Sequence, residues 1–244
     1  MFFFNHRTIQ IQHPETLHFL HIGKTGGTAL KHLFKEYNKG NNKYQIKLYG
    51  HKTKLNDIPV GEPIIFFLRD PISRFVSGFY SRQRQGAPRY SCQWNELEKE
   101  AFTLFNTPNE LAEALSDRDS ELNFKAEAAM KNIRHVNSHY YDTFINKDYF
   151  QSRKKDILFI GFQELLGKDY QKLKKILKIP KGLTLPDDEF LAHRSPEHLD
   201  KKLSDKAIIF LREWYKEDIL FLESCRGLRR NNFIHYIKSN FGLD

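Results

Sequence analysis

The chain has 244 residues, of which 40% are hydrophobic and 28% are charged, and its formal net charge is +9. These values are typical of a soluble globular protein with one large or two small domains, and the positive charge favours an anionic partner. Cys92 and Cys225 are too few for a disulfide framework, so two free thiols are expected and a single bridge stays open.

The N-terminal part of the chain predicts a strand, a tight loop and a helix in succession. Residues 17–22 (LHFLHI) are apolar and compatible with a strand that ends at Gly23. From Thr28 onward, the segment TALKHLFKEY has its apolar residues at helical spacing. Residues 43–49 (KYQIKLY) predict a second strand, which runs out at a glycine followed by His51.

The clearest strand is predicted at residues 63–70 (PIIFFLRD), because its run of five apolar residues is typical of a central parallel strand buried on both faces. Pro71 is suited to the first turn of a helix, and ISRFVSGFYSRQRQ follows with one apolar face. Residues 86–95 predict a loop. From there to about residue 150 the pattern is mostly helical and is interrupted near Pro108.

The C-terminal part predicts one more strand and two more helices. Residues 156–162 (DILFIGF) form the fourth strand, and residues 163–179 follow as an amphipathic helix. Residues 180–198 contain three prolines and predict a long loop. Residues 203–225 predict one final helix that Ser204 caps.

Strands that alternate with helices predict an α/β fold with a central parallel sheet flanked by helices, in a three-layer arrangement like that of P-loop proteins. No repeat or low-complexity linker divides the sequence. We therefore expect a single domain over residues 1–244, with its core at about 17–225.

The loop between the first strand and helix predicts an anion site. Its turn depends on three glycines, Gly23, Gly26 and Gly27. A helix that starts near Thr28 presents free amide groups and the positive end of its dipole, and Lys24 and Thr25 add further donors. In a nucleotide-binding P-loop the lysine follows the last glycine, whereas Lys24 precedes two of them. A plain glycine turn with a capping threonine is the alternative.

A second anion site is predicted where the strand at 63–70 ends. Arg69 leaves that strand, and Arg74 and Ser77 share one face of the following helix. An arginine fork with a serine hydroxyl suits a terminal phosphate. The alternative is that one arginine forms a structural ion pair with Asp70.

Taken together, FLHIGKTGGTAL and FFLRDPISRFVSGFY resemble the two signature motifs of carbohydrate sulfotransferases, nearest to the branch of heparan sulfate 2-O- and 6-O-sulfotransferases and their bacterial relatives. Weaker likeness extends over most of residues 17–223. The resemblance implies 3′-phosphoadenosine 5′-phosphosulfate (PAPS) as sulfuryl donor, adenosine 3′,5′-bisphosphate as product and no metal. The donor-binding residues that we expect are Gly23, Lys24, Thr25, Gly26, Gly27, Thr28, Ala29, Arg69, Ser77 and Ser195. For Ser195 and its neighbour Arg194, an exposed loop is an equal alternative.

The resemblance also implies catalytic roles for Lys24 and His51. His51 matches the position of the family's general base, after a strand that lies between the two motifs. A histidine suits this role because it can accept the proton of an attacking hydroxyl near neutral pH. Lys24 would neutralise the oxygen that gains charge as the sulfuryl group leaves. His21 is the second candidate base, although we expect it to pack under the loop or orient it. Weaker candidates are His18, His32, His135, His139 and His193.

The acceptor is expected to be a carbohydrate-type hydroxyl, and both neutral and anionic acceptor molecules stay open. Arg82, Arg84, Arg89 and Trp94 follow the donor motif and form a candidate cleft, with a solvated helix end as the equal alternative. Nucleic acid is not expected, because the sequence lacks zinc-finger spacing and RNP-type aromatic motifs. No cluster with metal-ligand spacing is present either.

Two other functions stay open at this point, namely a P-loop kinase-like phosphotransferase and a non-catalytic binder of glycans or nucleic acid with the same fold. The position of Lys24 argues against the kinase. The sequence has no apolar stretch of about 20 residues and no signal-peptide core, so we expect a soluble, cytoplasmic, bacterial-type protein. The lack of a Golgi anchor weakens the case for a heparan-type acceptor, and the oligomeric state stays open.

Overall fold

The computed structural model describes residues 15–40, 42–116, 120–186, 196 and 198–241. The described residues form a four-stranded sheet in the order β2-β1-β3-β4, and all its pairs are parallel. The strands are β1 (Glu15–Leu20), β2 (Tyr44–Leu48), β3 (Ile64–Leu68) and β4 (Ile157–Phe162). The predicted parallel α/β sheet is therefore confirmed. β3 is buried along its whole length, as its apolar run predicts.

The path of the chain changes direction at β1. β1 pairs with β2 on one side, where Leu17 lies opposite Ile46, and with β3 on the other, where Phe19 lies opposite Ile65. The connections after β1 and β3 therefore leave the carboxyl edge of the sheet on either side of one crevice. In open α/β sheets this switch point is where ligands bind.

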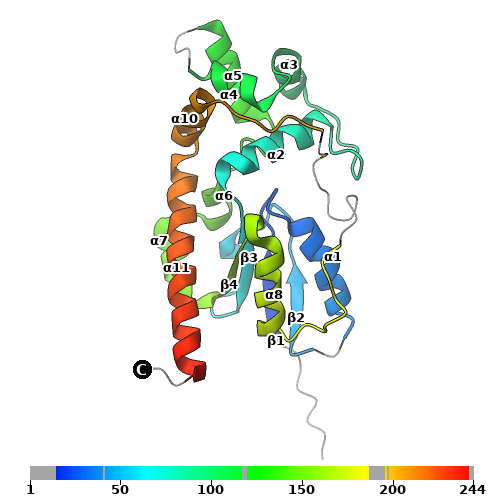
Figure 1. Ribbon diagram of the computed structural model, residues 1–244, viewed down its shortest axis with the longest axis vertical. Coiled ribbons are helices and arrows are strands. Elements are labelled where there is room, and N and C mark those ends of the chain that lie inside the picture. The colour runs from blue at the N-terminus through cyan, green and yellow to red at the C-terminus, as the bar shows by residue number, and fades with distance from the viewer. Residues whose placement is uncertain (1–14, 41, 117–119, 187–195, 197, 242–244) are drawn as a thin grey trace, which may run out of the picture.

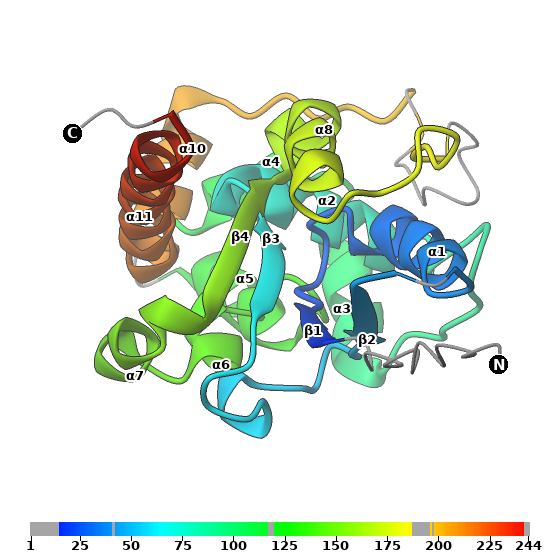
Figure 2. The ribbon, with the colours of Figure 1, turned by 90° about the horizontal axis from the view of Figure 1, so that it is seen from below.

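Two helical layers cover the sheet, as Figure 2 shows from below. On one face lie α1 (Gly27–Tyr37) and α8 (Leu166–Ile176), with Phe34 and Leu173 in the shared core. On the other lie α6 (Tyr140–Phe144) and α7 (Lys147–Ser152), and α11 (Lys216–Phe241) packs beside β4. This arrangement leaves the carboxyl edge of the sheet to a separate group of helices.

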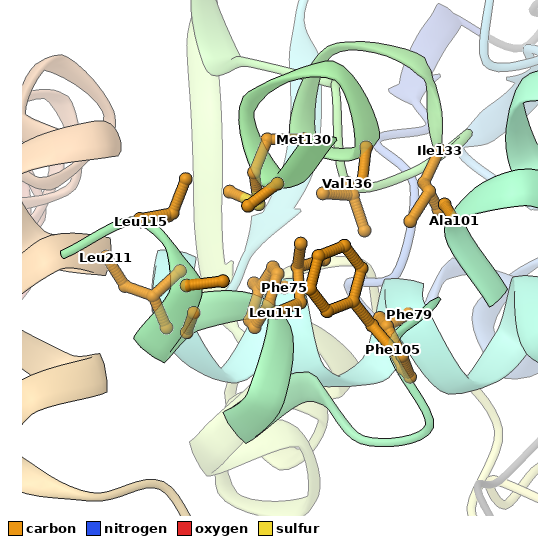
Figure 3. Packing of buried hydrophobic residues seen from close by; sticks show 14 of the residues in the cluster. Phe75, Phe79, Ala101, Phe105, Leu111, Leu115, Met130, Ile133, Val136 and Leu211 are labelled. Atoms are coloured by element: carbon orange, nitrogen blue, oxygen red, sulfur yellow. The ribbon is translucent and has the colours of Figure 1, made fainter. Parts of the chain in front are cut away.

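That group is built around α2 (Pro71–Gln83), which lies across the carboxyl edge (Figure 1). It comprises α3 (Glu96–Leu104), α4 (Pro108–Ala114), α5 (Glu121–Asn132) and α10 (Asp205–Trp214). Figure 3 shows its core, in which Phe75 and Phe79 of α2 meet Leu111, Met130 and Leu211. Burial of these apolar side chains fixes α2 above the strand ends.

The helical predictions hold with two differences. The helix expected at 163–179 begins only at Leu166, after a short 3₁₀ turn. The single final helix expected at 203–225 is wrong, because the chain bends at Tyr215 between α10 and α11. Tyr215 is buried and its hydroxyl donates to the carbonyl of Val136 at 2.7 Å, which ties the bend to the core. The predicted cap is confirmed, since Ser204 Oγ accepts from the amide of Ala207 at 3.1 Å.

Both thiols are free, with Cys92 partly exposed and Cys225 buried. None of the helices in the described part of the chain is long and apolar enough to cross a membrane.

Candidate active site

The loop after β1 is held by a buried threonine and two left-handed residues. Thr25 is buried, and its hydroxyl donates to the carbonyl of Ile22 at 2.9 Å. Lys24 has φ 65° and Gly26 has φ 83°. A left-handed conformation is strained for lysine and marks a position that the surrounding structure holds. Lys24 is therefore fixed at the tip of the loop.

The helix that follows this loop presents uncapped amides. Gly26 is the N-cap of α1 and has no side chain to accept from the first turn, where Thr28 and Ala29 lie. A Cβ atom at Gly27 would lie 2.1 Å from Cδ2 of His21, so only glycine lets α1 start against this ring. The loop therefore places free amide donors of an 11-residue helix at the carboxyl edge of the sheet.

Three histidines gather at Gly23. The ring centroids of His21 and His51 are 4.1 Å apart, and those of His51 and His135 are 5.9 Å apart. A Cβ atom at Gly23 would lie 3.4 Å from Nδ1 of His135 and 3.8 Å from Nδ1 of His51. The rings of His51 and His135 therefore flank the start of the loop, whereas His21 lies beneath it, in agreement with its expected packing role.

The surroundings keep these imidazoles neutral. Burial, with His51 next in effect, lowers the pKa of His21 to about 2. Burial and the charge of Lys24 lower the pKa of His135 to about 3. His51 is more exposed, and partial loss of hydration together with Lys31 lowers its pKa below 6.5. Neutral imidazoles can accept a proton, so the cluster meets one requirement for base catalysis.

His135 was only a weak candidate in the sequence, and tertiary contacts bring it here. Its φ is 71°, and a Cβ atom at Gly78 of α2 would lie 3.0 Å from its carbonyl oxygen. The amide of the preceding residue, Arg134, donates to Glu98 at 3.0 Å. No motif surrounds His135, so the sequence offered no signal for this placement.

Arg69 joins the second motif to the first. Its Nη1 donates to the carbonyl of Lys24 at 3.3 Å, and its Nε donates to Ser73 Oγ at 2.8 Å. Burial lowers the pKa of Arg69 from its ordinary value. Ser77 is buried one turn after Ser73, next to the Gly78 that abuts His135. The two predicted anion sites are thus connected through the contact between Arg69 and Lys24. Ser195 and Arg194 lie outside the described residues.

The expected phosphate role of Arg74 is wrong. Its side chain is buried and engaged by other residues, with Nη2 donating to the carbonyl of Ser138 and lying 3.7 Å from Asp218. Its guanidinium also stacks over the ring of Tyr140 at 4.5 Å. Asp70, the partner considered in the sequence, instead caps α2 by accepting from the amide of Ser73 at 2.9 Å.

Two of the four candidate acceptor residues are structural. Arg82 is buried and pairs with Glu98 at 2.5 Å, and Trp94 donates to the carbonyl of Arg82 at 2.6 Å while packing on the helical core. Arg89 lies over the ring of Tyr90 at 5.6 Å. Arg84 differs from these, because its charge and that of Arg69 act on Lys24. Together with burial, which has the largest effect, they lower the pKa of Lys24 to about 7.

The site is therefore a cluster of cations and neutral imidazoles beside uncapped amides. Lys24, Arg69 and Arg84 form no ion pair with a carboxylate within the part of the chain that the structure describes. Nor do the described His, Cys, Asp and Glu side chains form a group of three that could hold a metal ion. Such an excess of positive charge is suited to a polyanionic ligand.

A comparison with family models matches residues 7–223 to the model described as "Sulfotransferase family". The chain belongs to the sulfotransferase family. No curated protein matches this sulfotransferase. The match covers both loops at the carboxyl edge of the sheet, and the fold agrees with the α/β fold of the family. The family supports sulfuryl transfer in general, and the branch within it is not identified.

Proposed function

We propose that this sulfotransferase transfers a sulfuryl group from PAPS to a hydroxyl of a carbohydrate-type acceptor. The observation that carries the proposal is the convergence of the loops after β1 and β3, where Arg69 donates to the carbonyl of Lys24 and two neutral histidines flank Gly23. This arrangement combines an anion receptor with a candidate base, which sulfuryl transfer to a hydroxyl requires.

The residues present fit the donor. PAPS carries negative charge at both its 5′ and its 3′ end, and the site has three cations without paired carboxylates, uncapped amides at Thr28 and Ala29, and one buried guanidinium N–H without a partner. In the proposal, the loop Gly23–Ala29 holds the 5′ end, and Arg69 with Ser77 holds the 3′-phosphate. Binding of remote charge would align the reacting end.

When bound, PAPS supplies an activated sulfuryl group whose transfer releases adenosine 3′,5′-bisphosphate. Lys24 has the role of stabilising the negative charge that grows on the leaving oxygen. Its pKa of about 7 in the free protein means that the ammonium is costly there until an anion arrives. The positive charge of Lys24 is then better stabilised when an anion is bound than in the free protein.

His51 is the proposed general base, because it is the exposed member of the histidine cluster. Its pKa lies below 6.5, so the ring is neutral and able to accept a proton at neutral pH. His135, whose ring also lies beside Gly23, is a neutral acceptor for a hydrogen bond from the same hydroxyl. His21 is too buried to reach a substrate and instead supports the loop.

The experiment is incubation of the protein with PAPS and a panel of glycans, with release of adenosine 3′,5′-bisphosphate as the readout. We expect turnover with at least one glycan and calorimetric binding of the bisphosphate by the free protein. His51→Ala should reduce kcat by about a hundredfold or more, and His32→Ala, at an exposed position on α1, is the matched control. Absence of bisphosphate binding would overturn the proposed donor, and phosphate transfer from Mg-ATP would indicate a kinase instead.

The pH dependence tests the base separately. Activity requires neutral His51, so kcat/KM should fall as the pH drops through the pKa of this group. Because that pKa lies below 6.5, the acidic fall should be centred below pH 6.5. A profile centred above pH 7, or one that is unchanged in a residually active His51→Gln variant, would exclude His51 as the base.

A further inference from the structure

Arg84 is positioned at the end of α2 with one hydrogen-bonding group unused. It is the C-cap residue of this helix, and its Nε donates to the carbonyl of Ala87 at 3.3 Å. Its Nη1 is buried and has no hydrogen-bond partner among the residues that the structure describes. Among the described residues, the only other buried side-chain nitrogen or oxygen without a hydrogen-bond partner is Nδ1 of His21, which lies in the same site.

A buried guanidinium N–H without an acceptor destabilises the protein, because it loses water without gaining a partner. The loss of hydration also lowers the pKa of Arg84 from its ordinary value. A protein tolerates such a group where a ligand completes it. The unused donor therefore points to a ligand group that accepts hydrogen bonds and carries negative charge.

The segment that carries Arg84 is clamped to the helical layer. Immediately after it the backbone turns through two left-handed residues, Gln85 at φ 53° and Gly86 at φ 86°. The buried guanidinium of Arg82 donates to the carbonyl of Cys92 at 3.0 Å and to that of Gln93 at 3.1 Å. The loop is thus fixed at both ends, so Arg84 is held in place before a ligand arrives.

Arg84 and Arg69 approach Lys24 from the two ends of one helix. Arg69 precedes α2 and Arg84 follows it, and the 13 residues of α2 extend for about 20 Å. Both charges nevertheless act on Lys24. Arg69 contacts Lys24 directly at 3.3 Å, on the side of the predicted 3′-phosphate site, whereas Arg84 lies at the opposite end of α2.

We propose that Arg84 binds the oxygens of the sulfuryl group, on the side of Lys24 away from Arg69. This inference rests on the proposed function, in which Lys24 faces the oxygen that links phosphate to sulfuryl. Arg69 and Ser77 then bind the 3′-phosphate of the nucleotide, and the unused N–H of Arg84 is available to bind the sulfuryl group that is transferred. A sulfuryl group has three oxygens that share negative charge, which an arginine N–H matches well.

The test separates the sulfuryl group from the rest of the donor. PAPS has this group and adenosine 3′,5′-bisphosphate lacks it, so calorimetry of both ligands without acceptor isolates its contribution. For Arg84→Ala we expect the Kd for PAPS to rise by about tenfold to hundredfold, because one charge-assisted hydrogen bond is lost. The Kd of the bisphosphate should change by less than about threefold, which also shows that the variant is folded.

Two further variants sharpen the result. Arg84→Lys keeps the charge but not the planar N–H group and should recover only part of the PAPS affinity. Arg212→Ala, an exposed position on α10, should leave both affinities unchanged and controls for net charge.

Each outcome decides a different question. Equal weakening of both ligands by Arg84→Ala would overturn the inference in favour of a phosphate contact, and no weakening of either would show that Arg84 binds no part of the donor. Failure of the unaltered protein to bind the bisphosphate would instead overturn the proposed function.

Discussion

The two arginines inside α2 differ in kind from the two that flank it. Arg74 and Arg82 are each only 2% exposed, and each lies beside a carboxylate that is at most 2% exposed. Arg74 is 3.7 Å from Asp218, and Arg82 is 2.5 Å from Glu98. These pairs fasten α2 to α11 and α3, so their charges are used in holding the helices together.

The flanking pair has no such partner. Among the described residues, Arg69 and Arg84 form no ion pair with a carboxylate, and both lower the pKa of Lys24. Like charges gathered without counter-charges destabilise a protein unless a ligand supplies the opposite charge. An arginine in a motif is therefore informative about function mainly when the structure leaves its charge unbalanced.

The largest effect should be on the free energy of unfolding, which substitution of a paired arginine should lower far more than substitution of a flanking one. Arg82→Leu leaves the carboxylate of Glu98 buried without its cation and should lower the free energy of unfolding by about 3–5 kcal/mol. Arg84→Leu removes a cation that has no carboxylate partner among the described residues, and it should change this free energy by less than about 1 kcal/mol. Urea unfolding of both variants is the measurement.

A second substitution checks the cause of the loss. Adding Glu98→Leu to Arg82→Leu should restore part of the lost stability, because it removes the stranded charge. The restoration should be incomplete, since Glu98 also accepts from the amide of Arg134 at 3.0 Å. Equal destabilisation by Arg82→Leu and Arg84→Leu would contradict the distinction.

The next effect should be on turnover at Lys24. Lys24→Ala removes the charge proposed to face the leaving oxygen and should reduce kcat by about 10²–10³-fold, as loss of one preorganised stabilising group does in other enzymes. Release of the bisphosphate in the presence of an active glycan is the readout. Lys35→Ala, at an exposed position on α1, the helix that follows the loop, is the control. A reduction of less than about fivefold in the Lys24 variant would remove its catalytic role.

Local patterns were sufficient for the sheet and for both loops. Apolar runs and the breaks after them predicted the ends of β1, β3 and β4 to within two residues. This worked because a buried strand is a continuous run of apolar residues in the sequence. The two loops lie at one edge of the sheet, where Arg69 contacts Lys24, because the carboxyl ends of neighbouring parallel strands share that edge.

The features that failed depend on residues distant in sequence. Arg74 pairs with Asp218 of α11, and nothing near Arg74 in the chain indicates this partner. His135 enters the site because Gly78 and Glu98 hold its backbone. The break at Tyr215 was missed because the apolar spacing continues through it, whereas Tyr215 is tied to Val136, which is distant in the sequence.

A third prediction concerns protons that accompany ligand binding. Lys24 has a pKa of about 7 in the free protein, and a bound anion raises it. Above pH 7 the complex therefore holds more protons than the free protein, so the affinity for bisphosphate should fall with rising pH, by at most about tenfold per pH unit. Calorimetry at pH 8 in buffers of different ionisation enthalpy should detect proton uptake.

The same measurement with Lys24→Met provides the contrast, because that variant keeps the length of the side chain without a titrating group. Its proton uptake at pH 8 should be absent. The phosphate groups of the ligand are already ionised at this pH, since their second pKa is about 6. Uptake that persists in Lys24→Met would assign the proton to another group.

The smallest effect should be on acid stability, through a histidine that the substrate does not reach. His21 is 7% exposed and its pKa is lowered to about 2, mainly by burial, from an ordinary value of 6.5. Below pH 6.5 the unfolded chain binds a proton that the folded protein does not. Stability therefore falls as the pH falls, by up to about 1.4 kcal/mol per pH unit from this group. Urea unfolding at pH 7, 6 and 5 gives the slope.

His21→Gln should reduce that slope between pH 6 and 5, although the variant starts from a lower stability because Gln fits poorly against Gly27. The substitution His32→Gln, at an exposed position on α1, should leave the slope unchanged. An unchanged slope in His21→Gln would mean that acid unfolding begins elsewhere in the fold. The histidine beneath the loop would then not set the acid limit of the fold.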